Sequence, residues 1–487
     1  MRGKIRERLR SLQSLDLPTG DGRTMAYVYD SGLPESEQVG REALALYATT
    51  NGLDPTGFPS LLIMENDLIS TCAGLLHAPE GAAGAATSGG TESIILAVLA
   101  AREGAPRVDR PSIVVASSAH AAFHKAGKLL GVEVRVVPTD PVSRRAVPSA
   151  MAAACDSSTV LISGSAPSFG FGVIDPIADI AAIAAERGMR CHVDACIGGY
   201  VLPFLDDIPE WDFRLPGVTS ISVDLHKYGY TPKGISVLIH RDAELRKGHY
   251  FAWSDWPGYT LINPTLLSTR SGAPVAAAWA VTHHIGEDGY RELARSTRAA
   301  TLELALRIEG IDGLRVSAPP DSTLVAMETD GSCDVFTICD EMLERGWFIQ
   351  PQMSHDSGPP TAHLTLSAAT VAHLDAVTSA LEECVAAARA AGPIVPDPML
   401  VSALDALGSI DASQLDSSAI QAILGLAGLA GEDGSIRLPD RMAPVNALLD
   451  LIPPAVRDPI LVEVYGLLAT AQPLGVEVRH AGADFSD

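Results

Sequence analysis

The chain has 487 residues, of which 47% are hydrophobic and 19% charged, and its formal net charge is −24. This composition is typical of a packed globular protein and excludes an intrinsically disordered chain. The acidic balance argues against nucleic acid or an anionic membrane as the main partner, because a phosphate backbone requires a basic surface. The length predicts one large domain with one or two smaller units.

The cysteines and the N-terminal residues indicate the cellular compartment in which the protein works. Seven cysteines show no paired CxxC spacing, which indicates neither a zinc site nor a disulfide framework, so we expect no metal. The first residues, "MRGKIRERLRSLQSLD", are charged and lack the apolar core of a secretory signal. We find no apolar run near the ~20 residues that a membrane-spanning helix needs. The sequence therefore predicts a soluble, cytoplasmic protein without a transmembrane segment.

Residues 1 to 58 are predicted to form an N-terminal arm. A basic helix is followed by a "PTGDGR" turn and the segment "MAYVYDSG". Arms of this kind often pack on a partner subunit, and a frayed terminus is the alternative.

Residues 59 to 285 are predicted to form the large domain. Six short apolar runs indicate strands at 112 to 116, 133 to 138, 159 to 163, 190 to 195, 219 to 224 and 234 to 240. Helical patterns such as "HAAFHKAGKLLG" and "PIADIAAIAAERG" lie between several of them. Apolar strands that alternate with helices predict an α/β fold, with a mostly parallel sheet flanked by helices on both faces.

The pattern changes after residue 285. A long helical stretch, short strands such as "STLVAMET" and "AHLTLS", and a closing helix predict a smaller α+β domain over residues 286 to 395. The segment "GPIVPDPM" marks a linker, and residues 396 to 487 are predicted to be a helical extension interrupted by "GEDGS" and "LIPP".

A glycine-rich stretch, "TSGGTESIILAVLAARE", is a candidate phosphate site. Gly89 and Gly90 allow close backbone approach to a ligand, and Thr91 begins an amphipathic helix. Free amides and the positive end of the helix dipole then point at one place, which suits a phosphate. The alternative is a capping turn that binds nothing. The stretch is neither a GxGxxG motif nor a P-loop, which disfavours dinucleotides and nucleoside triphosphates.

Three further side chains follow strands of the same predicted sheet: Asp194 in "HVDACIGGY", His120 in "SSAHAAFHKAG" and Lys227 in "SVDLHKYGYTPKG". Taken singly, they could be a helix cap, a core or capping histidine and a solvated lysine. Because they belong to successive connections of one sheet, we expect them to cluster at one edge with the glycine-rich turn. Together they suit pyridoxal phosphate, with Lys227 as the Schiff-base amine, Asp194 on the pyridine nitrogen and His120 stacked on the ring.

A family resemblance adds to this interpretation. The stretches "TSGGTESI", "HAAFHKA", "GSAPSFGFGVIDPI", "HVDACIGG", "DLHKYGYTPKG" and "SDWPGYTLINPTLLSTRSG" resemble the sphingosine-1-phosphate lyase branch of the group II pyridoxal-phosphate-dependent decarboxylases. The resemblance runs from about residue 20 to 390. It implies a type I aminotransferase-like fold and a homodimer with active sites at the subunit boundary.

The resemblance also implies roles for individual residues. Lys227, Asp194 and His120 keep the roles given above, and Ala195 would lie beneath the cofactor ring. The implied cofactor-phosphate contacts are Gly90, Thr91 and His226, with Thr269 reaching the cofactor of the neighbouring subunit.

On the substrate side, the resemblance places Tyr29 and Lys233 near the phosphate end of the substrate. Arg270 is a candidate anion contact, because a guanidinium can grip a carboxylate or phosphate with two hydrogen bonds. The sequence departs from the family at "NGLDPTGFPSL", where Asp54 stands at the position of a histidine. An aspartate there would repel a phosphate.

The expected reaction is cleavage of a carbon–carbon bond in a small-molecule amine, an amino alcohol with or without a phosphate. An amino-acid decarboxylase using the same cofactor is the alternative, and a binding or scaffolding protein that kept the fold without the activity is a third hypothesis. The choice between the first two depends on which Cα bond stands perpendicular to the cofactor ring.

Overall fold

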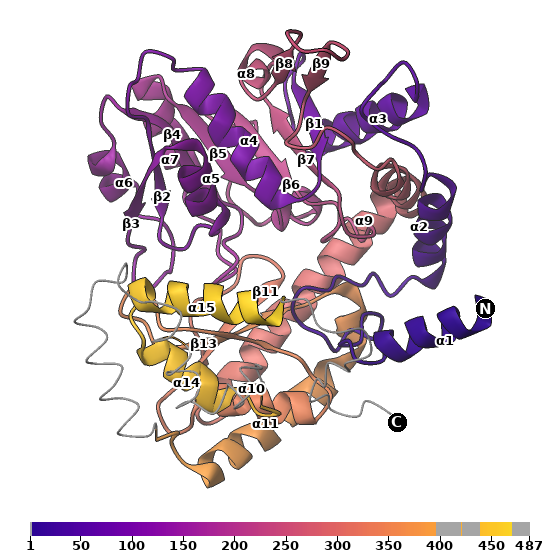
Figure 1. Ribbon diagram of the computed structural model, residues 1–487. Coiled ribbons are helices and arrows are strands. Elements are labelled where there is room, and N and C mark those ends of the chain that lie inside the picture. Colours follow the sequence, from indigo (N-terminus) through magenta and orange to yellow (C-terminus); the bar gives the residue numbers. More distant parts are fainter. Residues whose placement is uncertain (1, 396–419, 421–438, 470–487) are drawn as a thin grey trace.

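The computed structural model describes residues 2–395, 420 and 439–469. Much of the helical extension predicted for residues 396 to 487 therefore lies outside the described residues. Figure 1 shows a large domain above a smaller one, with one long helix running through both.

The large domain is built on a seven-stranded sheet. Its strand order is β1-β7-β6-β5-β4-β2-β3. The strands are β1 (Ala83–Thr87), β2 (Ser112–Ala116), β3 (Glu133–Val137), β4 (Thr159–Ser165), β5 (Arg190–Asp194), β6 (Ser220–Val223) and β7 (Ser236–His240). Strands β2 to β6 pair in parallel, and β7 is antiparallel to both β6 and β1. All six predicted strands are present, so the predicted mostly parallel α/β sheet is confirmed.

Helices cover both faces of this sheet. They are α3 (Pro59–Leu75), α4 (Gly90–Glu103), α5 (Ala122–Leu130), α6 (Pro148–Ala154), α7 (Ile177–Arg187) and α8 (Ala243–Lys247), with the short 3₁₀ turns η1 (Gly198–Tyr200) and η2 (Leu202–Phe204). Alternate residues of β2 face different cores. Val114 packs in the same core as Ile180 of α7, whereas Val115 packs with Phe123 of α5. Burying each such side chain contributes about 1.5–3 kcal/mol, which explains why both faces of β2 carry apolar residues.

The small domain has a four-stranded antiparallel sheet in the order β10-β11-β13-β12. Its elements are β10 (Leu314–Val316), β11 (Leu324–Thr329), α10 (Val335–Glu344), β12 (Gln350–Gln352), β13 (Thr361–Thr365), η3 (Ala368–His373) and α11 (Leu374–Ala391). It has a separate apolar core that includes Phe336, Leu364 and Leu381.

Helix α9 (Ala273–Glu309) joins the two domains. Its first half buries Ala278 in the large-domain core and its second half buries Leu304 and Ile308 in the small-domain core. The helix is interrupted at Gly286, where φ is 65°. Glycine adopts this backbone conformation more readily than any other residue. This interruption lies between the part of α9 that packs in the large-domain core and the part that packs in the small-domain core, and the predicted domain bounds stay predictions.

The predicted arm is more structured than expected. Besides α1 (Arg2–Gln13), it contains α2 (Pro34–Leu46), which packs on α9. Between these helices the backbone of Met25 joins the small domain: its N–H donates to the Phe348 carbonyl at 2.8 Å, and its carbonyl accepts from Thr365 N–H at 2.7 Å. Helix α1 projects from the body of the molecule, with Ile5 and Leu9 exposed (Figure 1).

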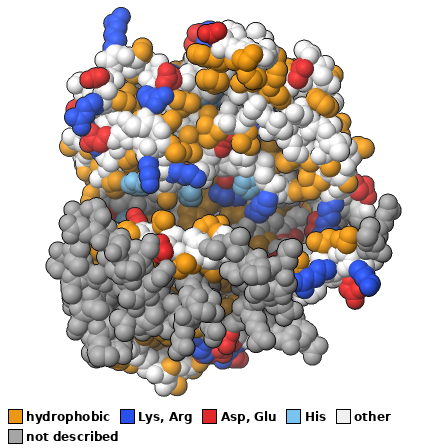
Figure 2. Space-filling view, in the orientation of Figure 1, with side chains coloured by type: hydrophobic (Ala, Val, Ile, Leu, Met, Phe, Trp, Pro, Cys, Tyr) orange, Lys and Arg blue, Asp and Glu red, His pale blue; other side chains and the backbone are white. Residues whose placement is uncertain are grey.

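A hairpin of β8 (Phe251–Trp253) and β9 (Leu261–Asn263) carries exposed apolar side chains. The exposed residues on and near it are Phe251, Trp253, Trp256, Tyr259, Ile262, Leu266 and Leu267. Figure 2 shows hydrophobic side chains gathered at the top of the molecule, where this hairpin lies in Figure 1.

The described part of the C-terminal extension lies against the small domain. It contains α14 (Ala443–Leu451) and α15 (Pro454–Leu468). The Asp340 carboxylate of α10 accepts hydrogen bonds from the backbone N–H groups of Met442 and Ala443, at 3.0 and 2.8 Å, and so caps α14. Across the described ranges, no helix is both long and apolar enough to cross a membrane. All seven cysteines are unpaired and buried.

Candidate active site

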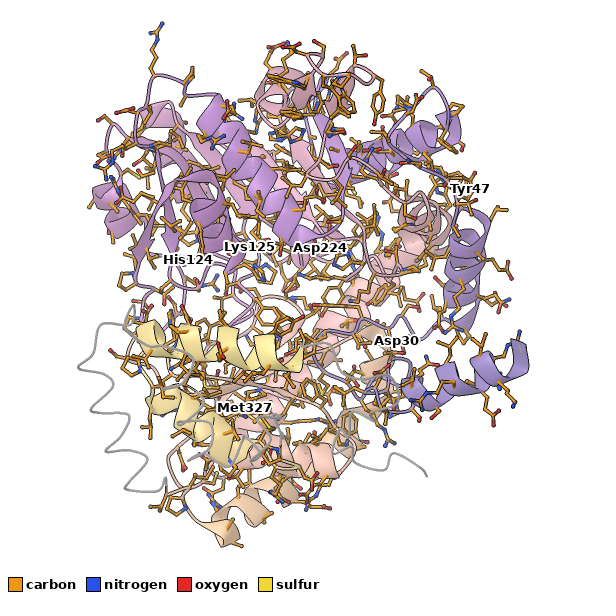
Figure 3. All side chains as sticks on the ribbon, in the orientation of Figure 1. Asp30, Tyr47, His124, Lys125, Asp224 and Met327 are labelled. Carbon is orange, nitrogen blue, oxygen red and sulfur yellow. The ribbon has the colours of Figure 1, made fainter. Side chains whose placement is uncertain are left out.

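A cavity of about 380 Å³ opens at the carboxyl edge of the parallel strands, where open α/β sheets bind ligands. The residues that line it are Ser88, Gly89, Gly90, Thr91, Glu92, Ile94, His120, Pro167, Phe169, Asp194, Cys196, Ile197, Asp224, His226 and Lys227. In Figure 3 the labelled Asp224 lies at the edge of the large domain that faces the small domain. Six of the predicted site residues meet in this cavity: Gly90, Thr91, His120, Asp194, His226 and Lys227.

Lys227 is held by a buried carboxylate. It lies in the turn after β6, and its Nζ is 3.0 Å from Oδ2 of Asp224, whose side chain is 2% exposed. Ser236 donates a hydrogen bond to Oδ1 of the same carboxylate at 2.5 Å. Burial alone would lower the pKa of Lys227, but the nearby charge of Asp224 outweighs it and raises that pKa. The alternative interpretation, a solvated surface lysine, does not fit this geometry.

Asp194 ends β5 and is 8% exposed. Its Oδ1 accepts a hydrogen bond from the Cys196 N–H at 3.1 Å and lies 3.5 Å from the hydroxyl of Ser222, which donates to it. These contacts fix a carboxylate at the cavity wall. Ala195, the next residue, is fully buried.

The glycine-rich turn approaches the floor of the cavity closely. A Cβ placed on Gly90 would lie 2.6 Å from Sγ of Cys196 and 2.9 Å from both carboxylate oxygens of Asp224, so this position accepts no side chain without rearrangement. Gly90 also begins α4. The first amides of a helix have no partner within it, and their dipole favours an anion.

Two histidines complete the wall. His120 is exposed at the cavity, and its Nδ1 accepts a hydrogen bond from Ala122 N–H at 3.1 Å. The Nδ1 of His226 accepts from Ile235 N–H at 3.3 Å, and its Nε2 lies 3.7 Å from Asp224. Burial lowers the pKa of His226, although Asp224 opposes this shift. A neutral imidazole is therefore favoured at His226.

Tyr29 and Lys233 lie next to one another. The Lys233 Nζ is 4.9 Å from the centre of the Tyr29 ring, and it donates hydrogen bonds to the carbonyls of Tyr27 at 2.8 Å and His226 at 3.2 Å. Burial, together with the charge of Lys227, lowers the pKa of Lys233 to about 8. The structure thus brings a cation and a phenol close to His226 and Lys227, and their contact with the substrate stays a prediction.

Three residues lie apart from this cavity. Arg270 pairs with Glu65 through two contacts of 3.4 and 3.2 Å and also donates to the carbonyls of Ala86 and Gly52. Thr269 is exposed and follows the end of β9 (Leu261–Asn263) in the sequence. The Asp54 carboxylate accepts hydrogen bonds from Thr56 and Gly57 of its own turn. A substrate contact for Arg270 and a cofactor contact for Thr269 stay predictions.

The residues of the cavity fit pyridoxal phosphate. Lys227, whose side chain is 20% exposed, offers an amine, Asp194 offers a carboxylate on a second strand, and a helix N-terminus beside Gly90 and Thr91 suits a phosphate. Among the described residues, no group of three or more metal-ligating side chains is found.

Sequence reasoning missed Asp224, Cys196 and the Glu65 partner of Arg270. Asp224 had a usable signal, since it follows an apolar strand in the same way as Asp194 does. Cys196 and Glu65 had none, because their roles arise from contacts between distant segments.

The comparisons with known proteins first define a class. The pyridoxal-dependent decarboxylase conserved domain matches residues 25–254, and a pyridoxal-dependent enzyme C-terminal putative HTH domain matches residues 401–467. The solved Lactobacillus brevis glutamate decarboxylase shares the fold with a TM-score of 0.71, at 23% identity over 81% of this chain and 94% of that one. The fold is thus that of pyridoxal-phosphate-dependent decarboxylases and lyases, and the cofactor is pyridoxal 5'-phosphate.

Within this class, the chain belongs to the sphingosine-1-phosphate lyase family. It is 40% identical to the lyase of Dictyostelium discoideum over 334 residues, 68% of this chain and 62% of that protein. It is 35% identical to the Arabidopsis thaliana lyase over 389 residues, 77% of this chain and 70% of that protein. The chain thus spans between three fifths and seven tenths of the length of these two relatives. The solved Burkholderia pseudomallei sphingosine-1-phosphate lyase is 36% identical, with a TM-score of 0.74 over 80% of this chain and 92% of that one.

Proposed function

We propose that this protein is a pyridoxal-phosphate-dependent lyase that cleaves the Cα–Cβ bond of an amino alcohol, such as a sphingoid base phosphate, to an aldehyde and an aminoethyl product. The observation that carries the proposal is the convergence of Lys227, Asp194 and His120 on one cavity of a chain that belongs to this family. When bound, the cofactor withdraws the electron pair of the bond that breaks at Cα.

The residues of the chain divide the remaining work. Lys227 supplies the amine that joins the cofactor, and Asp224 orients that amine at 3.0 Å. With the cofactor bound, Asp194 would keep the proton on the pyridine nitrogen and His120 would cover the ring. Gly90, Thr91 and His226 would hold the cofactor phosphate, with the helix N-terminus of α4 supplying donors.

The substrate is oriented from the other side. Lys233 and Tyr29 are assigned to its anionic end, where a cation lowers the energy of a bound phosphate. A base takes the hydroxyl proton at Cβ as the carbonyl of the aldehyde forms, and one proton returned to Cα completes the amine product, so that the protons balance. An amino-acid decarboxylase is the second candidate. The observation behind it is Asp54, which stands where the resemblance implies a histidine near the substrate and so argues against a phosphorylated substrate without affecting the cofactor.

Product analysis tests the proposal. The holoenzyme is incubated separately with sphinganine-1-phosphate and with a panel of amino acids. An aldehyde released from the first substrate, and abolished in Lys227→Ala, is the expected result. Release of carbon dioxide from an amino acid, with no aldehyde formed from either kind of substrate, would contradict the lyase assignment and support the decarboxylase.

We further propose that the protein works as a homodimer with shared active sites. The exposed apolar side chains of the β8–β9 region support this, because a patch of this kind marks an interface. Thr269 lies next to this patch and would reach the cofactor phosphate of the other subunit. Analytical ultracentrifugation of wild type and of a Trp253→Glu variant tests the assembly, with a loss of dimer expected in the variant.

A cytoplasmic location and a lack of nucleic-acid binding complete the proposal. Seven unpaired cysteines suit a reducing compartment. The segment that matches the putative HTH domain, residues 401 to 467, has nine acidic and three basic residues, a net charge of −6. Such a charge opposes contact with a phosphate backbone. A gel-shift assay with duplex DNA is expected to show no complex.

A further inference from the structure

A second, smaller cavity is lined by a buried arginine, Arg144, whose side-chain Nε has no hydrogen-bond partner among the described residues. The residue Arg144 is 7% exposed, and its Nε is enclosed with no hydrogen-bond partner in the described part of the chain. Its guanidinium lies over the ring of Phe171, with 5.2 Å between Cζ and the ring centroid. An arginine is almost never this buried unless it is well paired, and the ion pair found for this guanidinium is one long contact of 3.8 Å with Glu328. The cavity therefore leaves room for a further anionic ligand.

The backbone holds Arg144 in place. Its φ is 57°, a left-handed conformation that residues other than glycine rarely adopt. A closed turn maintains it: Arg144 N–H donates to the Asp140 carbonyl and Asp140 N–H donates to the Arg145 carbonyl, each at 2.9 Å. Conformations of this kind persist where the surrounding structure enforces them, and they gather at functional sites.

The cavity in front of Arg144 is small and partly polar. It measures about 110 Å³, and its walls include Phe171, Gln352, His355, Gly358 and Thr361. A Cβ on Gly358 would lie 2.8 Å from Nη1 of Arg144, so glycine at this position makes room for the guanidinium. The volume suits a phosphate or carboxylate group and is too small for a nucleotide.

The neighbouring charges leave Arg144 under-compensated. Oε2 of Glu328 lies 3.8 Å from Nη2 of Arg144 and has no hydrogen-bond partner in the described chain, while Oε1 of the same carboxylate pairs with Arg315 at 2.7 Å. One carboxylate thus serves two guanidinium groups. Asp356 lies 3.7 Å from Nε2 of His355, but it accepts hydrogen bonds from Ser117 and Thr139.

We propose that this cavity, the Arg144 pocket, binds a small oxyanion, a carboxylate or a phosphate group, through the guanidinium of Arg144. The planar group can donate two hydrogen bonds to such an anion, and His355 and the Thr361 hydroxyl offer further donors. The site is separate from the cofactor site but shares a loop with it. Phe169 lines the active-site cavity, and the carbonyl of the next residue, Gly170, accepts a hydrogen bond from Gln352 Nε2 at 3.0 Å.

Calorimetric titration of the holoenzyme with inorganic phosphate, and separately with acetate, tests the proposal at constant ionic strength. The bound cofactor fills its own phosphate site, so the titration reports other sites. Wild type is expected to bind one anion per chain, and Arg144→Gln to weaken binding by at least about tenfold, the value of one charge-assisted hydrogen bond. Stronger binding of acetate than of phosphate would identify a carboxylate as the preferred anion, and the reverse would identify a phosphate.

Three further variants make the result decisive. Arg41→Gln, at an exposed residue paired with Glu37, is the matched control and is expected to bind as wild type does. Gly358→Ala keeps Arg144 but places a methyl group against its guanidinium, so this variant is expected to weaken anion binding. It provides a second test should Arg144→Gln fail to fold. Lys233→Met tests the substrate site. Anion binding that is lost in Lys233→Met but unchanged in Arg144→Gln and Gly358→Ala would overturn the proposal.

Discussion

The Lys227 ammonium and the Asp224 carboxylate form a buried ion pair, with 3.0 Å between Nζ and Oδ2. Burial raises the pKa of Asp224, but the charge of Lys227 and the hydrogen bonds from Ser236 and Lys227 oppose burial, and that pKa lies below its ordinary value. The pair therefore keeps the lysine protonated until the cofactor arrives. An amine must lose its proton before it attacks an aldehyde, so Asp224 controls how readily the cofactor is taken up.

Replacing Asp224 by Asn is expected to lower the pKa of Lys227 by roughly 1–3 units, the effect of one opposite charge at this distance. A larger fraction of the lysine is then neutral at a given pH, so the pH midpoint for uptake of pyridoxal phosphate by the apoenzyme shifts downward. Stopped-flow absorbance between pH 6 and 10 measures the shift. Asp206→Asn, which alters an exposed pair with Arg295, is the control, and equal midpoints in all three proteins would contradict the assignment.

Asp194→Asn is expected to lower kcat by about 10²–10³-fold, the typical value of a preorganised electrostatic contact. The amide retains the shape of the side chain and loses its negative charge, so the ring nitrogen no longer holds its proton. The cofactor should still attach to Lys227, which borohydride reduction and peptide mapping will show. A variant with normal kcat would remove Asp194 from the site.

Lys233 predicts a pH dependence of substrate binding. Its pKa is lowered to about 8, so its side chain is cationic below that pH and neutral above it. The KM for a phosphorylated substrate is therefore expected to be constant below pH 8 and to rise above it. Burial and the charge of Lys227 both lower the pKa of Lys233. When the bound cofactor removes that charge, the pH midpoint of the rise in KM is therefore expected to move above 8. Lys233→Arg should abolish the rise between pH 7 and 10, and a rise that persists in this variant would assign the titration to another group.

Gly90→Ala is expected to destabilise the fold by about 1–3 kcal/mol, the usual cost of overpacking, and to weaken cofactor binding. The added methyl group would lie 2.6 Å from Sγ of Cys196 and 2.9 Å from Asp224. Denaturant unfolding and cofactor titration measure the two effects. Gly74→Ala is the control, since a Cβ there meets nothing within 4 Å, and it should be neutral or slightly stabilising because alanine favours a helix.

Asp340→Ala is expected to loosen α14 by about 1–3 kcal/mol, because two backbone N–H groups lose their acceptor. Hydrogen exchange of the α14 amides should accelerate while kcat stays unchanged. Asp312→Asn, at an exposed carboxylate paired with Arg389, should leave exchange as in wild type. Equal exchange in Asp340→Ala would show that other contacts hold the helix.

The elements that were predictable from the sequence are those with a strong local signal. The six predicted strands are rich in β-branched residues, and all of them except the edge strand β3 are buried over most or all of their length. Strand β1, "AGAAT", was missed because alanine and glycine carry little strand signal. Helix α2 was missed because its mixed sequence depends on packing against α9.

The residues of the candidate site divide in the same way, into those with a local sequence signal and those whose contacts join distant segments. Lys227, Asp194 and His120 each follow a strand, so topology alone brings them to one edge. The pairing of Arg270 with Glu65 joins residues 205 positions apart, and no local pattern reveals that the guanidinium is already engaged. The Arg144 pocket likewise depends on a turn and a loop from different domains.

The burial of all seven cysteines makes the native thiols a natural reporter. A folded sample should react slowly with a disulfide reagent, and the full complement of seven should appear when the chain unfolds. A single cysteine introduced on the exposed face of α1 or β8 would then be labelled selectively. Spectroscopic probes can therefore be placed on this enzyme without first removing any of its own sulfhydryl groups.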